Sequence, residues 1–117
     1  MENPLDILVE NKDFISIIHV SGIITMYNQD ILKKVFKEEL EKELDIIAFN
    51  AKNIIQIDSS TINMFFKFAK DSIGKSIKLV IYDLNPHIKR LFNIAQLNKF
   101  FMITSKNDFY TEFFNEY

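Results

Sequence analysis

The sequence predicts one α/β domain over residues 1–117, with a mixed, mainly parallel β-sheet, an N-terminal hairpin and about four helices. Two observations predict this class. The first two apolar runs are separated by a short polar turn, and the later apolar runs alternate with segments of helical periodicity, which is typical of parallel strands. A composition of 48% hydrophobic and 26% charged residues, with 12 Phe, indicates a well-filled core.

The hairpin is predicted from residues 5–11 and 14–21, which flank the turn Lys12-Asp13. After Gly22, a helix capped by Asn28 is expected, because apolar residues follow at spacings of three and four. These residues are Ile31, Leu32, Val35, Phe36 and Leu40.

A third strand is predicted over residues 45–50, and residues 51–57 lead from it to a turn at Asp58. A helix is then expected from Ser59 to Ile73, with Gly74 as its C-cap. Its predicted buried stripe consists of Ile62, Phe65, Phe66, Ala69 and Ile73.

Residues 77–82 predict the fourth strand, and Asn85-Pro86 supplies a cap and a first-turn proline for the next helix. Residues 100–104 predict a short last strand. Residues 108–114 predict a terminal amphipathic helix.

Met64 and Phe68 fall outside the predicted buried stripe of the helix from Ser59 to Ile73. Exposed apolar side chains beside the serines would form a docking surface. The alternative is that a neighbouring helix covers both side chains, and the sequence leaves the two interpretations equally open.

Asp58-Ser59-Ser60 stands where a strand feeds a helix N-terminus, and Asp58 or Ser59 can serve as the cap. Free N–H groups and the helix dipole make such a turn tolerant of an added phosphate. The local sequence by itself favours a simple capping role.

Several function classes have little support. Because the chain has no cysteine, and because His19 and His87 lie far apart without a ligand motif, neither cysteine chemistry nor a metal or cofactor site is predicted. The net charge of −2 argues against nucleic-acid binding, and two glycines cannot build a nucleotide-cradling loop. No apolar run reaches the roughly 20 residues of a membrane span, so we expect a cytoplasmic protein without membrane contact.

Two motifs together resemble the STAS domain, in its anti-sigma factor antagonist branch. One is the strand, the Asp58-Ser59-Ser60 turn and the helix that follows. The other is Pro86-His87-Ile88-Lys89-Arg90-Leu91-Phe92, which continues to Leu97. The resemblance covers about residues 5–113, although Thr61, Gln96 and the segment Gly22-Ile23-Ile24-Thr25 depart from the family pattern.

The resemblance implies a non-catalytic partner switch. The unmodified domain would bind an anti-sigma factor serine kinase, phosphorylation would release it, and a serine phosphatase would be a further partner. By position, Ser59 is the expected phosphate acceptor and Ser60 the second choice. The expected partner-binding residues are Asp58, Ser59, Ser60, Thr61, Met64, Phe68, Gly22, Thr25 and Asn28.

Two alternatives remain. In the first, the same domain is an unmodified interaction or scaffold module in a bacterial signalling assembly. In the second, Ser59 is the nucleophile of a hydrolase with His87 as its base, which the missing GxSxG motif disfavours.

Overall fold

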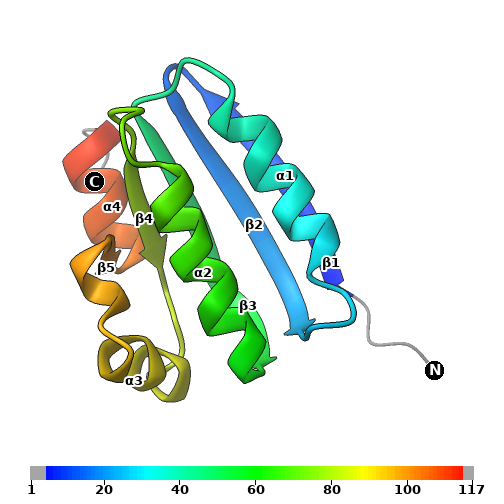
Figure 1. The fold of residues 1–117 in the computed structure, drawn as a ribbon. Coiled ribbons are helices and arrows are strands. Elements are labelled where there is room, and N and C mark those ends of the chain that lie inside the picture. The colour runs from blue at the N-terminus through cyan, green and yellow to red at the C-terminus, as the bar shows by residue number, and fades with distance from the viewer. Residues whose placement is uncertain (1–4, 115–117) are drawn as a thin grey trace.

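The fold is a five-stranded sheet with helices on both faces (Figure 1). The computed structural model describes residues 5–114. In chain order the elements are β1 (Leu5–Lys12), β2 (Ile15–Ile24), α1 (Asp30–Leu40), β3 (Ile46–Ile57), α2 (Ser59–Asp71), β4 (Lys78–Tyr82), α3 (Pro86–Ile94), the 3-10 turn Leu97–Lys99, β5 (Phe101–Thr104) and α4 (Lys106–Phe114). The strand order is β1-β2-β3-β4-β5, with β1 antiparallel to β2 and all other pairs parallel. The predicted fold class is therefore confirmed.

The hairpin turn lies one residue later than predicted. Lys12 pairs with Ile15, so Asp13 and Phe14 form the turn. Asp13 has a φ of 56°, a left-handed conformation that aspartate tolerates better than most residues. Phe14 is exposed, but its carbonyl accepts a 2.8 Å hydrogen bond from the Asp45 N–H and so ties the turn to the start of β3.

Strands β2 and β3 are longer than predicted, and they end together. Gly22 lies inside β2 with a φ of 116°, a left-handed conformation that glycine adopts without strain, beside an irregularity in the register with β3. β3 continues without a break through the predicted connecting segment, and Ile24 pairs with Ile57 at the end of the two strands. The residues that follow, Thr25 and Asp58, therefore leave the sheet at the same point.

The start of α1 differs from the prediction because Asn28 belongs to the preceding loop. The N-cap is Gln29, which makes no capping side-chain hydrogen bond, and the helix begins at Asp30. Leu32 and Phe36 are buried as the periodicity indicates, whereas Ile31 is half exposed.

The end of α2 also differs from the prediction. The helix stops at Asp71 with Ser72 as its C-cap, and Gly74 lies beyond the cap with a φ of 86°. Ile73, expected in the buried stripe, lies past the helix end and is 74% exposed.

Met64 and Phe68 are buried, so the expectation that they form a docking surface is wrong. Each is 3% exposed. The Phe68 ring stacks on Phe36 of α1 with 4.1 Å between ring centroids, and α1 is the neighbouring helix that the alternative interpretation required. Figure 1 shows α1 and α2 lying side by side over the same face of the sheet.

The sheet separates two apolar clusters. The larger one joins α1, α2 and α3 to the sheet through contacts among aromatic rings, for example Phe65 with Phe49 and Phe92. The smaller one lies on the opposite face, where Phe109 of α4 stacks on Tyr82 of β4. The predictions of β4, β5 and α4 are confirmed to within two residues at both ends, and α3 begins at Pro86 as predicted.

Two polar features hold the ends of helices. The Asn85 side chain accepts a 2.8 Å hydrogen bond from the Ile88 N–H, as predicted for the cap of α3. Near the end of α1, the buried carboxylate of Glu39 accepts hydrogen bonds from three side chains, namely Ser16 (2.8 Å), Asn11 (3.0 Å) and Lys42 (3.1 Å), and its other oxygen lies 2.9 Å from the Lys42 ammonium.

None of the helices within residues 5–114 has the length and apolar character needed to cross a bilayer.

Candidate functional site

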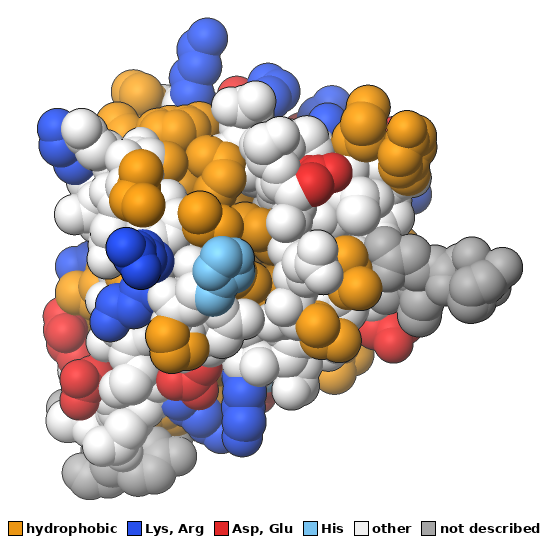
Figure 2. Space-filling view, turned by 90° about the horizontal axis from the view of Figure 1, so that it is seen from below, with side chains coloured by type: hydrophobic (Ala, Val, Ile, Leu, Met, Phe, Trp, Pro, Cys, Tyr) orange, Lys and Arg blue, Asp and Glu red, His pale blue; other side chains and the backbone are white. Residues whose placement is uncertain are grey.

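The candidate site lies at the end of the sheet where β2 and β3 finish and α2 begins. The loop between β2 and α1 leaves the sheet here beside the turn between β3 and α2. Figure 2 looks onto this end of the molecule and shows hydrophobic side chains across its middle. Ligand and partner sites of open α/β sheets commonly lie at the carboxyl ends of parallel strands.

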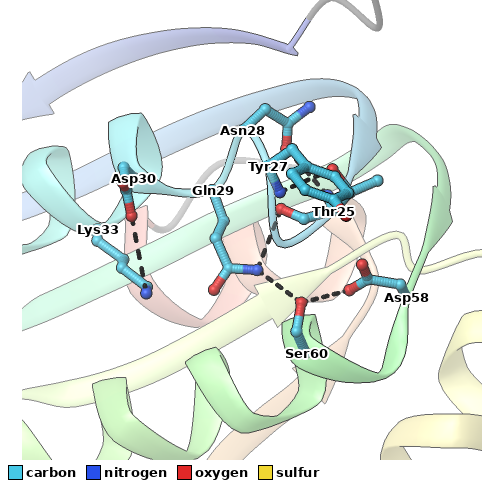
Figure 3. A network of polar contacts seen from close by, with 8 residues as sticks. All are labelled: Thr25, Tyr27, Asn28, Gln29, Asp30, Lys33, Asp58 and Ser60. Atoms are coloured by element: carbon cyan, nitrogen blue, oxygen red, sulfur yellow. Dashed lines mark hydrogen bonds and ion pairs between the residues drawn. The ribbon is translucent and has the colours of Figure 1, made fainter.

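Asp58 accepts hydrogen bonds both from the start of α2 and from the loop before α1, and Figure 3 shows its bond with Ser60. Its backbone is extended, and its side chain caps α2 by accepting a hydrogen bond from the Thr61 N–H at 3.2 Å. The same carboxylate accepts from the Ser60 hydroxyl at 2.5 Å and, through its other oxygen, from the Met26 N–H at 3.0 Å. Burial alone would raise the pKa of Asp58, but the hydrogen bonds from Ser60, Met26 and Thr61 outweigh it and lower the pKa below its usual value.

The two neighbouring serines have different environments. Ser59 is exposed at the first position of α2. Ser60 is half-buried, and its hydroxyl donates to Asp58 while accepting a 2.8 Å hydrogen bond from the Gln29 side chain. The Ser59 side chain is thus open to solvent, whereas the Ser60 hydroxyl links two parts of the chain.

Thr61 faces inward, so its predicted role as a partner contact is wrong. The side chain is fully buried, and its hydroxyl lies 3.1 Å from the Ile24 carbonyl, to which it donates a hydrogen bond. This bond ties the first turn of α2 to the end of β2. Since the Thr61 side chain points into the protein, it leaves the outer surface of the turn open.

Residues 25–28 form a turn with its own hydrogen bonds. The Asn28 side chain accepts from the Thr25 N–H at 2.9 Å and donates to the Ile23 carbonyl at 2.8 Å. Gln29, which is 5% exposed, follows this turn and reaches from the start of α1 to Ser60 (Figure 3). The structure therefore places Thr25 and Asn28 beside the Asp58 turn.

Met26 and Tyr27 are the surface residues that the sequence analysis missed. Their side chains are 61% and 89% exposed, and the Met26 backbone is bonded to the residue that precedes Ser59. The available signal was an apolar pair between the polar residues Thr25 and Asn28, in the segment between a predicted strand and a predicted helix.

The remaining predicted contacts lie elsewhere. Gly22 is within the sheet, and Met64 and Phe68 are in the core between α1 and α2, so a partner at the surface cannot reach these two side chains.

The arrangement gives no support to a hydrolase. Ser59 and His87 are both exposed, and no hydrogen bond joins them within the described part of the chain. Residues 5–114 also contain no group of three His, Asp or Glu side chains placed to hold a metal ion.

Comparisons with known proteins agree with this architecture. The family model of the STAS domain matches residues 6–112. An anti-sigma factor antagonist from Mycobacterium paratuberculosis has a similar structure, with a TM-score of 0.77, 18% identity and 90% of each chain covered.

Two structures of SpoIIAA are also similar. The unphosphorylated anti-sigma factor antagonist SpoIIAA matches with a TM-score of 0.72 and 10% identity, covering 96% of this chain and 99% of that one. The phosphorylated form, described as a Bacillus cell fate determinant, matches with a TM-score of 0.69 and 11% identity, covering 88% and 95%. At these identities the likeness concerns the fold. No curated protein matches the sequence.

Proposed function

Because the chain belongs to the STAS domain family, we propose that it is an anti-sigma factor antagonist that acts by partner switching. With Ser59 unmodified, the domain binds an anti-sigma factor serine kinase. Phosphorylation of Ser59 releases the kinase, and a serine phosphatase restores the binding form. The domain works in the cytoplasm as a binding module without a catalytic centre of its own.

One observation carries the proposal: Ser59 is exposed, while the neighbouring Ser60 is engaged by hydrogen bonds on both sides. A phosphate on Ser59 adds a charge of about −1.5 to −2 at neutral pH. The N-terminus of α2 tolerates this charge, since the dipole and the N–H groups of the first turn favour anions there. The protein can therefore accept the phosphate without unfolding, and the change is confined to its surface.

The proposed contact surface consists of Ser59, Asp58 and the loop residues Met26, Tyr27 and Asn28. It offers two exposed apolar side chains and one carboxylate whose oxygens are already hydrogen-bonded. A partner that packs against this surface should lose affinity when Ser59 carries a phosphate. Binding would then remove water from the phosphate, and any acidic group of the partner would repel it. Tyrosine, with tryptophan and arginine, is one of the residue types enriched among those that dominate binding energy at interfaces, which supports a contact role for Tyr27.

The test is capture of a cognate anti-sigma factor serine kinase by variants at Ser59. Ser59→Ala should bind as well as the unchanged protein, and Ser59→Asp should bind at least tenfold more weakly. Asn63→Asp, which adds the same charge one turn further along α2 at an exposed position, is the matched control and should bind normally.

Mass spectrometry after incubation with the kinase and ATP should find phosphate on Ser59 and none on Ser60. Equal binding by the Ala and Asp variants, with no phosphate on either serine, would contradict partner switching. That result would support the unmodified scaffold module instead.

A further inference from the structure

We infer that Asp58 couples Ser59 to the loop that carries Met26 and Tyr27, so that a phosphate on Ser59 loosens this loop as well as adding charge. The inference rests on the proposed function, in which Ser59 is phosphorylated and Tyr27 contacts the partner. It concerns how the modification is transmitted to the contact surface.

The loop holds its own conformation through short-range hydrogen bonds. The Tyr27 N–H donates to the Thr25 hydroxyl at 3.1 Å, and the Thr25 N–H donates to the Asn28 side chain at 2.9 Å. These bonds join residues of the same turn and do not depend on α2. A change at α2 can therefore shift the turn without breaking it.

Two side-chain links connect this turn and the start of α1 to the start of α2. One is the bond from the Met26 N–H to Asp58, and the other is the bond from Gln29 to Ser60. The first is exposed to solvent and the second is half-buried. Asp58 takes part in both links, because its carboxylate also accepts a hydrogen bond from the hydroxyl of Ser60.

A phosphate on Ser59 acts on this carboxylate directly. Ser59 follows Asp58 in the chain, so the two negative groups are close and repel each other. The phosphate also competes with Asp58 for the N–H groups at the start of α2, where an anion is most favoured. The bond to the Met26 N–H is the one most easily lost, since water can replace it.

The experiment compares amide hydrogen exchange, measured by NMR at low salt, in the protein with serine or phosphoserine at position 59. Loss of a hydrogen bond to a charged acceptor should speed exchange of the Met26 N–H about tenfold or more. Exchange of the Tyr27 N–H, whose acceptor is Thr25, should stay within about twofold. Phosphoserine in place of Asn63 should leave the Met26 N–H unchanged, which controls for charge on α2 in general.

Asp58→Asn provides a second, independent variant. Asparagine keeps the capping oxygen for the Thr61 N–H, but its amide nitrogen then faces the Met26 N–H and cannot accept from it. Exchange of the Met26 N–H should be fast in this variant without phosphate. Adding phosphoserine at position 59 should change it less than twofold, because the coupling residue is already lost.

The outcomes separate this inference from the proposed function. If phosphoserine at position 59 weakens kinase capture while the Met26 N–H exchanges at its original rate, release occurs by direct repulsion and the coupling is refuted. If phosphoserine at position 59 leaves kinase capture intact, the proposed function fails whatever the exchange rates are. Fast Met26 exchange in Asp58→Asn that increases a further tenfold with phosphate would also refute the coupling through Asp58.

Discussion

Replacing Phe68 with alanine tests whether α2 presents an apolar docking surface or a core face. Phe68 is 3% exposed, and its ring lies 4.1 Å from Phe36, 5.5 Å from Phe65 and 5.8 Å from Phe49, measured between ring centroids. These contacts join α1, α2 and β3. A truncation at this position leaves a cavity between three elements that cannot easily close.

The expected loss is about 3–5 kcal/mol of unfolding free energy, the usual cost of truncating a buried phenylalanine. Domains of this size are stabilised by only about 5–15 kcal/mol, so the variant should be close to the limit of folding. With an unfolding entropy of roughly 2.1 cal/mol/K per residue over 117 residues, the midpoint of thermal unfolding should fall by about 12–20 °C.

Urea titration and calorimetry measure this loss, and Phe66→Ala is the matched control. Phe66 lies on the same helix and is only half-buried, and within residues 5–114 its one ring contact is with Phe100 at 6.1 Å, so its truncation should cost about half as much or less. A loss below about 1.5 kcal/mol for Phe68→Ala, or one equal to that of Phe66→Ala, would refute the assignment of Phe68 to the core.

Further predictions concern exposed, buried and titratable groups. Because Tyr27 is exposed, Tyr27→Ala should change the unfolding free energy by less than about 0.5 kcal/mol and yet weaken kinase capture at least tenfold. Unchanged capture would show that Tyr27 is not part of the contact surface. Ser60→Ala should cost about 1–2 kcal/mol in urea titration because it removes one of the two acceptors of the buried Gln29 amide, the other being the Thr25 carbonyl, whereas Ser59→Ala should cost almost nothing; equal losses would contradict the difference between the two serines. Burial alone would raise the pKa of Glu39, but hydrogen bonds from Lys42, Asn11 and Ser16 lower it below its ordinary value of 4.5. Ionised Glu39 therefore contributes stability that is fully present above about pH 4.5 and is lost as the pH falls through the lower pKa of the folded state. Glu39→Gln should be less stable than the unchanged protein at pH 7 and should lose less stability on acidification. Acid denaturation curves of equal steepness for the two proteins would disprove this.

The sequence was sufficient for features that depend on neighbouring residues in the chain. Local backbone chemistry left Asp58 or Ser59 as the cap of α2 and predicted Asn85-Pro86 as the start of α3; in the structure Asp58 is the cap of α2, and α3 begins as predicted. The same local logic placed Ser59 at the first helical position.

The buried stripe of α2 was predicted too far to one side of the helix, which left out Met64 and Phe68. The polar residues Ser59, Asn63, Lys67, Lys70 and Asp71 do share an exposed face, but the apolar residues fill more than half of the circumference, and the part of it that neighbours cover most closely depends on the tertiary structure. The choice is made by α1, which lies against Phe68, and by the sheet, which lies against Phe65.

The link between Gln29 and Ser60 was equally inaccessible to the sequence. It joins residues 31 positions apart, and it exists only because β2 and β3 end at the same level of the sheet. The exposure of Met26 and Tyr27 has the same origin, since the loop is held outward by bonds that the parallel pairing makes possible.

The position of α4 gives the protein a convenient place for a reporter group. This helix packs on the face opposite α2, against Tyr82 and its neighbours, and Glu112 on it is exposed. Since the chain has no cysteine, Glu112→Cys would supply a unique thiol for a fluorophore. The β-sheet would lie between the dye and the bound partner. The fluorescence anisotropy of the dye would then report slower tumbling on binding, and the dye would not block the contact surface.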